Sequence, residues 1–151
     1  MKTTNQILIV LAVMSLMSCG QLHVVTLYVD TTQIDQSSID QHASFGQPAG
    51  ISNQDFKTNV RKGDRIIWQG VSISNPSDEV KITAIDHVSG AIIYAQKSLK
   101  GRKGSDELVV GTVKIGPGKL EQYIEEKYSL DFTVTNKGTF QIDPVMRAYR
   151  K

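Results

Sequence analysis

The sequence predicts an all-β protein: a single β-sandwich domain of seven or eight strands that follows an N-terminal signal peptide. The sandwich is predicted by short segments of alternating apolar and polar residues, separated by Gly, Pro, Asn and Asp turn signals and not by helical segments. The signal peptide is predicted by the apolar run Ile7–Met17, which is too short to cross a bilayer as a helix. We therefore expect a signal peptide over residues 1–18 and the sandwich over residues 22–151.

The single cysteine of the chain, Cys19, directly follows this run and Ser18. Leu16, Ser18 and Gly20 surround it in an order that resembles the lipobox of bacterial lipoproteins, although Met17 departs from the small residue usual at the middle position. The resemblance implies cleavage before Cys19, a diacylglycerol on its sulfur and a fatty acyl chain such as palmitate on its new amino group. Two or three acyl chains make membrane anchoring stable.

Residues 19–21 are then expected to be the lipidated N-terminus and a short tether. Because Gly20 and Gln21 include no retention-type Asp, resemblance to Gram-negative lipoproteins implies the cell envelope, at the outer membrane facing the periplasm. The alternative is an ordinary signal peptide cleaved near Ser18, which would leave a free thiol that is unusual in a secreted chain.

Composition limits the function classes. Beyond Cys19 the chain has no thiol, so disulfides are excluded and one hydrophobic core must stabilise a domain of about 130 residues. The whole chain has 17 basic and 15 acidic side chains, and loss of Lys2 with the signal peptide leaves 16 against 15. This balance argues against nucleic acid as a partner and against electrostatic binding to a membrane.

Four segments of the first half predict strands, joined by turn residues at Lys62–Asp64 and Asn75–Asp78. The first segment has apolar residues on both faces, which indicates a strand covered on both sides. The four segments are Leu22–Asp30, Asp55–Arg61, Arg65–Ser74 and Val80–Val88. The predicted core residues of the domain are Phe56, Trp68, Ile82, Phe132 and Val134.

The second half predicts further strands at Ala91–Lys97, Leu108–Ile115, Tyr128–Val134 and Thr139–Ile142, the last two as a closing hairpin. Only Lys119–Lys127 has apolar residues at helical spacing, which predicts a helical turn or two. Pro144 cannot donate a ladder hydrogen bond, so the tail after it is predicted to be an edge strand.

One long segment, Thr31–Asn53, has no strand pattern and is rich in Ser, Gln, Asp and Gly. Loops of more than about 12 to 15 residues are usually functional or disordered. This loop is therefore the first candidate for a binding surface.

The turn Lys62–Asp64 followed by Ile66, Ile67 and Trp68 resembles cupredoxins, so we expect an Ig-like or cupredoxin-like Greek key. A blue-copper site needs two His, a Cys and usually a Met. Cys19 is used at the anchor, and no His-Cys-His-Met cluster lies near the C-terminus, so we expect no metal and no cofactor. The histidines of the chain are His23, His42 and His87.

Asp86 and His87 are the pair that most suggests acid–base chemistry. Neighbours on a strand point to opposite faces, so the two do not converge by sequence alone. No nucleophile elbow, phosphate-binding loop or His-Glu-x-x-His occurs, and we expect the protein not to be an enzyme. The alternative is a metal-binding or hydrolytic domain in which His42, Asp86 and His87 converge in three dimensions.

Two parts of the chain resemble the AidA/PixA-type bacterial inclusion-body proteins. The first is Val29–Ile34 (VDTTQI), with Asp-Thr-x-x-Ile closing a strand, and the second is Asp55–Ile85, with Gly-Asp-x-Ile-x-Trp opening one. Ser72, Ser74 and Asp78 continue the match. The resemblance implies a β-sandwich without an established catalytic site.

The second half, through VVGTV (109–113), EEKYSLDFTV (125–134) and GTFQIDP (138–144), resembles uncharacterised secreted proteins of marine Bacteroidetes. Neither resemblance implies a ligand. We expect a lipid-anchored envelope protein whose non-catalytic domain binds a glycan, a peptide or an envelope protein, or has a structural role. Convergence of two of the three imidazoles with a carboxylate would instead favour the metal-binding or hydrolytic alternative.

Overall fold

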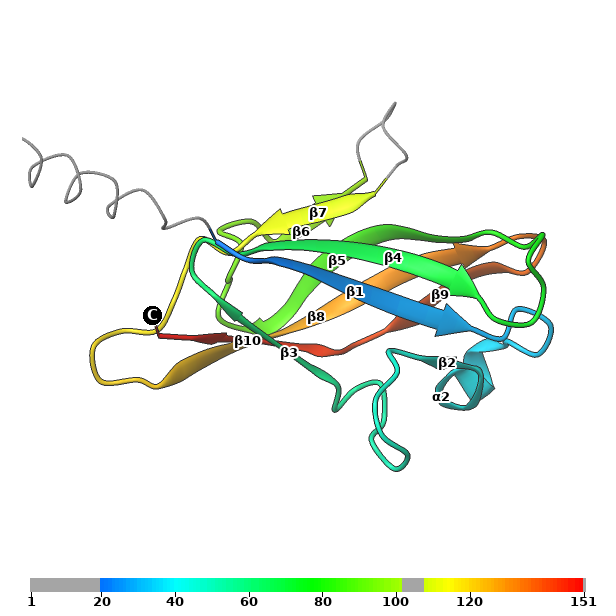
Figure 1. Cartoon of the computed structure of the whole chain (residues 1–151), viewed down its shortest axis with the longest axis horizontal. Helices are drawn as coiled ribbons and strands as arrows, with labels where there is room; N and C mark the ends of the chain where they lie inside the picture. The colour runs from blue at the N-terminus through cyan, green and yellow to red at the C-terminus, as the bar shows by residue number, and fades with distance from the viewer. Residues whose placement is uncertain (1–19, 102–107, 151) are drawn as a thin grey trace, which may run out of the picture.

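The computed structural model describes residues 20–101 and 108–150. The predicted signal peptide and Cys19 lie outside these residues. Two β-sheets pack face to face over one core, and the longest strands run the length of the molecule (Figure 1). Within the described part of the chain, no helix is long and apolar enough to span a membrane. The predicted all-β sandwich is confirmed.

The first sheet has four strands, which are β1 (Leu22–Val29), β2 (Ala43–Ser44), β4 (Arg65–Ser72) and β7 (Val109–Thr112). Their order is β2–β1–β4–β7. The pair β1 and β4 is parallel, from Leu22 beside Arg65 to Val29 beside Ser72, and β2 and β7 flank it as antiparallel edges. The start of β1 and the start of β4 therefore lie at the same end of the sandwich.

The second sheet contains the remaining strands, which are β3 (Lys57–Arg61), β5 (Val80–Gly90), β6 (Ser98–Lys100), β8 (Tyr123–Val134), β9 (Gly138–Ile142) and β10 (Val145–Tyr149). Their order is β3–β10–β8–β5–β6, with β9 also paired to β8. The described residues thus form ten strands, more than predicted, because β2 and β6 have only two and three residues and the tail forms β10.

Aromatic side chains fill the space between the sheets. Trp68, Tyr128 and Phe132 are fully buried, and the Trp68 ring packs edge-on against Tyr94 and Tyr128. Of the predicted core residues, Trp68, Ile82, Phe132 and Val134 are buried, whereas Phe56 is half-buried at the margin of the core, stacked on Phe45.

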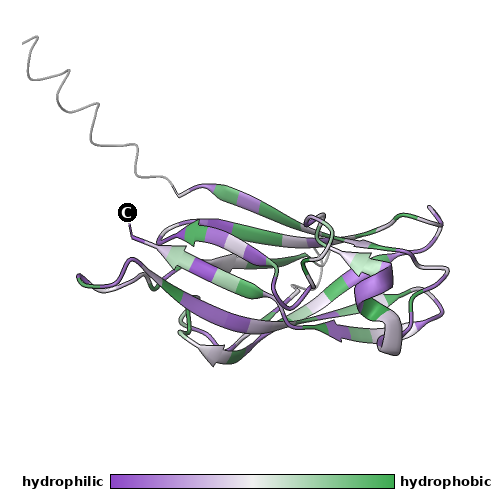
Figure 2. Cartoon of the chain, turned by 90° about the horizontal axis from the view of Figure 1, so that it is seen from below, coloured by the Kyte–Doolittle hydropathy of each residue, from purple (hydrophilic) through white to green (hydrophobic). Residues whose placement is uncertain are grey.

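The outer face of β1 is open, contrary to the prediction of a strand covered on both sides. Val25, Leu27 and Val29 face the core, but Val24 and Tyr28 are 53% and 39% exposed. Alternation along the strands, visible as changing hydropathy in Figure 2, is the pattern of sheets buried on one face. Apolar residues on the outer face of β1 therefore do not indicate that this face is covered.

The predicted helical turn at 119–127 is wrong, because Tyr123–Lys127 begins β8. This part of β8 pairs with β10 on one side and with β5 on the other. Ladder hydrogen bonds on both sides outweigh a weak local spacing of apolar residues.

The predicted strand at Ala91–Lys97 is also wrong. β5 continues to Gly90, whose φ is +86° and where a Cβ would lie 2.4 Å from the Glu125 carbonyl oxygen. The chain then leaves the sheet, and Ile93 and Tyr94 fold inward as buried residues. The Ile93 N–H donates to the side chain of Glu126 and the Ala95 N–H to the Ile92 carbonyl oxygen, so this segment forms a turn and not a strand ladder.

The tail is not an edge strand, because β10 lies between β3 and β8. β9 and β10 continue in one register along β8, with Ile142 opposite Leu130 and Val145 opposite Lys127. Pro144 falls in the gap between them, where its missing N–H interrupts no assigned pair. A proline just before a strand is compatible with a central position for that strand.

The long loop is organised by short elements of its own. It contains a 3-10 turn at Gln36–Ser38, the helix α2 (Ile39–His42) and β2. Ile34, Ala43 and Phe45 are buried and join the main core. The candidate binding loop is therefore packed onto the sandwich.

Candidate functional site

The sandwich has two ends of different construction (Figure 1). The Gly20 end comprises residues 20–22, 61–65, 113–122 and 149–150, around the start of β1 and the end of β10. The α2 end comprises residues 30–56, 73–79 and 135–137, beyond the end of β1 and the start of β5. The twelve residues of β8 connect them, a length of roughly 40 Å at 3.3 Å per residue.

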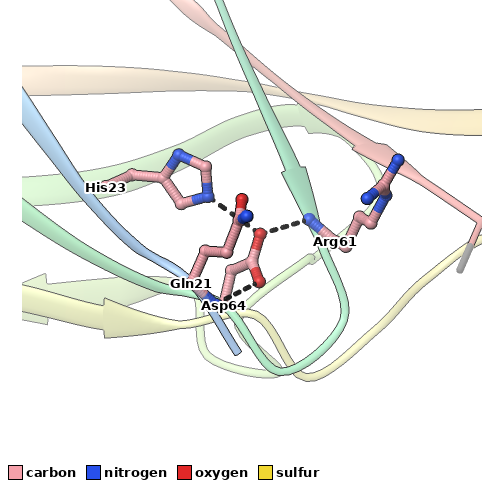
Figure 3. Close-up of polar contacts among 4 residues, drawn as sticks. All are labelled: Gln21, His23, Arg61 and Asp64. Atoms are coloured by element: carbon pink, nitrogen blue, oxygen red, sulfur yellow. Dashed lines mark hydrogen bonds and ion pairs between the residues drawn. The ribbon is translucent and has the colours of Figure 1, made fainter. Parts of the chain in front are cut away.

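A buried carboxylate, that of Asp64, organises the Gly20 end (Figure 3). Its Oδ1 accepts a hydrogen bond from the Gln21 N–H at 2.8 Å, and its Oδ2 accepts one from the Arg61 N–H at 2.8 Å. His23 Nε2 lies 2.9 Å from Oδ2. One side chain thus joins the beginning of β1 to the turn between β3 and β4.

The pKa of Asp64 lies below its ordinary value. Burial acts to raise it, but the hydrogen bonds from the Arg61 backbone, from His23 and from the Gln21 backbone together outweigh that effect. Asp64 is therefore ionised at neutral pH, and its charge is satisfied inside the protein.

Gly20 is locked against the same turn. A Cβ on Gly20 would lie 1.8 Å from the Gly63 carbonyl oxygen, so the close approach of the two backbones requires glycine at position 20. Gly20 is thus in direct contact with the Lys62–Asp64 turn. Only the peptide bond separates Gly20 from Cys19.

The loop between β7 and β8 projects beside this turn, where a Cβ on Gly116 would lie 3.5 Å from Lys62 Cβ. The Arg150 guanidinium braces the loop by donating to the carbonyl oxygens of Gly118 at 2.6 Å, Lys119, and Glu121 at 2.9 Å. Leu120 lies at the centre of this braced segment and is fully exposed. The loop holds an apolar side chain in solvent on a fixed backbone.

The α2 end carries a hollow of about 400 Å³ between the long loop and the connection from β9 to β10. Most of the side chains around it are uncharged and polar, and α2 is close enough to contribute Asp40 and Gln41. The remaining lining comes from Gln36, Ser37, Ser38, Ile39, Gln54, Gln141, Ile142 and Asp143. Such a surface offers amide, hydroxyl and carboxylate groups for hydrogen bonds with a polar ligand.

Two buried polar side chains hold the loop around the hollow. Asn53, 1% exposed, donates from Nδ2 to Asp40 Oδ1 at 2.7 Å and to the Ala43 carbonyl oxygen at 2.9 Å. Thr31, fully buried, shares hydrogen bonds with the hydroxyls of Ser72 and Ser74 at 2.8 and 3.2 Å. Thr31, Ser72 and Ser74 belong to the residues that carry the PixA-type resemblance. Their hydrogen bonds join the segment after β1 to the end of β4.

Charge is divided between the two ends. The exposed basic side chains of the Gly20 end are Arg61, Lys62, Arg65, Lys114, Lys119 and Arg150, against a single exposed acid, Glu121. The acidic side chains of the α2 end are Asp30, Asp35, Asp40, Asp55, Asp78 and Glu79, against a single base, Lys137. Exposed charges are largely screened beyond about 8 Å at physiological ionic strength, so each end acts through its own charge and not through the net charge of the chain.

The three histidines lie at separate places. His23 pairs with Asp64 at the Gly20 end, His87 Nδ1 lies 2.9 Å from Glu126 Oε1 in the second sheet, and His42 ends α2. Over residues 20–101 and 108–150, no three His, Cys, Asp or Glu side chains gather in a metal-binding arrangement. His42, Asp86 and His87 therefore form no metal-binding cluster in this part of the chain.

Glu126 is a buried acid that the sequence analysis missed. Its Oε2 accepts the Ile93 N–H at 2.7 Å, and Oε1 contacts His87. Burial raises the pKa of Glu126, against the lowering effect of these hydrogen bonds. Its neighbours in the sequence are the charged residues Glu125 and Lys127, and Glu125 is only half-buried, so the local pattern offers no signal that Glu126 is buried.

The fold and these two ends define a class of protein: a β-sandwich in which buried polar side chains hydrogen-bond separate segments of the chain to each other. The chain matches the family model described as a domain of unknown function (DUF8788) over residues 3–139, and it belongs to that family. Among solved structures it is similar to the inclusion body protein PixA of Burkholderia cenocepacia J2315, with 16% identity and a TM-score of 0.56. That likeness covers 90% of this chain and 99% of PixA, and it shows a shared fold. The search of curated proteins returned no match.

Proposed function

We propose that the protein is a lipid-anchored cell-envelope protein whose sandwich is a non-catalytic binding or structural module. The observation that carries the proposal is the placement of the two ends. Gly20, the neighbour of the lipobox Cys19, is packed into one end, and the polar hollow lies toward the other. An acylated Cys19 would therefore hold the Gly20 end at the membrane and present the α2 end to the surroundings.

A non-catalytic role is supported by what the polar residues do. Asp64, Asn53 and Thr31 are engaged in hydrogen bonds that join segments of the fold. The hollow lacks a histidine among its lining residues and is lined chiefly by amides and hydroxyls. Its chemistry suits a glycan or a peptide with many hydrogen-bonding groups, or a polar surface of an envelope protein.

The anchor is tested by the variant Cys19→Ala in the native host, with Ser15→Ala as the control in the same apolar run. Wild type and the control should sediment with membranes, and Cys19→Ala should be released. Mass spectrometry of the wild-type N-terminal peptide should show Cys19 as the first residue with acyl chains attached. Sedimentation of Cys19→Ala with membranes would contradict the anchor.

The hollow is tested by screening the purified protein against arrays of oligosaccharides and of peptides. A ligand of the hollow should lose binding in Gln41→Ala/Gln54→Ala, two exposed lining residues. It should keep binding in Gln96→Ala, which lines a different hollow beside β6 and β7. Equal binding by both variants would place the ligand elsewhere and contradict a role for the hollow.

A further inference from the structure

Three features occur together at the Gly20 end and not at the α2 end. The Gly20 end begins one residue after Cys19, it carries six exposed basic side chains, and it holds the fully exposed Leu120 on a braced loop. We propose that this end is a bilayer-contacting surface, with its basic residues on anionic phospholipid headgroups and Leu120 inserted at the interface. This inference rests on the proposed lipid anchor.

The first argument is the lack of a spacer. Consecutive Cα atoms are about 3.8 Å apart, so the Cα of an acylated Cys19 would lie about that far from the Cα of Gly20, which packs against the domain. Gly20 contacts Gly63, and the adjacent Lys62 lies beside Gly116 of the β7–β8 loop. An anchor at Cys19 would therefore bring this turn and this loop to the headgroup region, because no flexible chain is available to hold the domain away.

The second argument is the exposed apolar surface. Leu120 is fully exposed, and Ile115 and Tyr123 at the two ends of the same loop are 45% and 42% exposed. The backbone between them is held by Arg150 and by the Gly118 N–H, which donates to Glu121 Oε2 at 3.0 Å. Transfer of an exposed leucine from water into an apolar phase lowers the free energy. Because the loop backbone is already held in place, ordering of the loop adds little entropic cost to that transfer.

The third argument is charge complementarity. Anionic lipid attracts Lys and Arg near its surface, with an effect of roughly fivefold in affinity per basic residue. The Gly20 end has a local excess of such residues, while the α2 end has an excess of acids that anionic lipid would repel. The negative charge of the bilayer surface therefore favours one orientation of the protein, with the Gly20 end at the bilayer and the α2 end away from it.

The test uses the full-length, acylated protein in vesicles, with a thiol-reactive fluorescent dye at position 120. Leu120→Cys provides the labelling site, since acylation consumes the thiol of Cys19. Ile73→Cys is the matched control, because Ile73 is 65% exposed at the α2 end. The vesicles contain a quencher on the lipid acyl chains and are made of phosphatidylcholine, with or without phosphatidylglycerol.

We expect the dye at position 120 to be quenched several-fold more strongly than the dye at position 73. The difference should be larger in vesicles with phosphatidylglycerol and should decrease in Lys119→Glu, but not in Lys137→Glu, which changes the net charge equally at the α2 end. Equal quenching at both positions of a protein that sediments with the vesicles would overturn the orientation and leave the anchor standing. Acylated protein that does not sediment would overturn both proposals.

Discussion

The loops at the two ends of the sandwich are held in place by different kinds of buried polar side chain. At the Gly20 end, the carboxylate of Asp64 accepts hydrogen bonds from two backbone N–H groups and contacts His23. At the α2 end, a neutral amide, Asn53, and a neutral hydroxyl, Thr31, hold the long loop to the sheets. The end with a basic surface is thus held by a buried carboxylate, whereas the buried side chains that hold the end with an acidic surface are a neutral amide and a neutral hydroxyl, and the amide donates to the exposed carboxylate of Asp40.

This difference follows from the cost of burying charge. A buried carboxylate is tolerated where donors surround it, and the turn between β3 and β4 supplies them in its backbone. The α2 end already has six acidic side chains at its surface, so a buried anion there would add repulsion. The neutral side chains of Asn53 and Thr31 add no such repulsion.

The largest expected effect on stability comes from removing the buried carboxylate of Asp64. Asp64→Ala leaves the Gln21 and Arg61 N–H groups without their acceptor, and it should lower the free energy of unfolding by about 3 kcal/mol. Asn53→Ala, the matched change at the α2 end, should lower it by about 2 kcal/mol because it removes a neutral amide that donates to Asp40 Oδ1 and to the Ala43 carbonyl oxygen. Urea unfolding followed by circular dichroism measures both, and a smaller loss for Asp64→Ala would break the comparison.

An intermediate effect is expected from acid. The folded-state pKa of Asp64 lies below its ordinary value of 3.8, so the unfolded chain takes up this proton first as the pH falls. The stability contributed by Asp64 is thus fully present above pH 3.8 and is lost as the pH falls through the folded-state pKa. The difference in unfolding free energy between wild type and Asp64→Asn should shrink over that range. The difference between wild type and Thr31→Val should stay constant there, because the hydrogen-bond partners of Thr31 are the hydroxyls of Ser72 and Ser74, which do not titrate. A parallel decline in both differences would show that the loss of stability in acid is not due to Asp64.

The smallest expected effect concerns exposed apolar residues. Leu120→Ser and Ile73→Ser should each change the unfolding free energy in solution by less than about 0.5 kcal/mol, because neither side chain is buried. Thermal unfolding of both variants beside wild type measures this. A loss well above that limit for Leu120→Ser would show that the side chain packs against the protein, and would weaken the case for its insertion into lipid.

Much of the fold was predictable because it depends on local pattern. The alternation in Leu22–Val29 and Arg65–Ser72 and the turn residues at 62–64 and 75–78 identify strands and connections that the structure confirms. The predictions that proved wrong concern Lys119–Lys127, Ala91–Lys97 and the tail after Pro144. In each of these segments the conformation depends on a partner strand or a core position that local sequence does not reveal.

The candidate site was predictable in part. The long loop was identified from its length and composition, and it does line the hollow at the α2 end. The burial of Asp64, Asn53 and Glu126 was not predictable, because a polar residue is buried only where distant backbone groups come into hydrogen-bonding range. The acidic character of the α2 end is visible in the sequence, because residues 30–56 contain four Asp and no Lys or Arg.

What the sequence determined by itself was the all-β class, the pattern of inward and outward residues and the balanced net charge, since each follows from composition or from a two-residue period. The expected signal peptide and lipid anchor rest on the lipobox resemblance. Only the tertiary structure decided that basic side chains gather at one end of the sandwich and acidic side chains at the other. Parallel pairing of β1 with β4 and of β3 with β10 gathers the basic turns at Gly20 and the acidic loops at α2. Because charges more than about 8 Å apart are screened from each other, this division matters more than the net charge that suggested no electrostatic role.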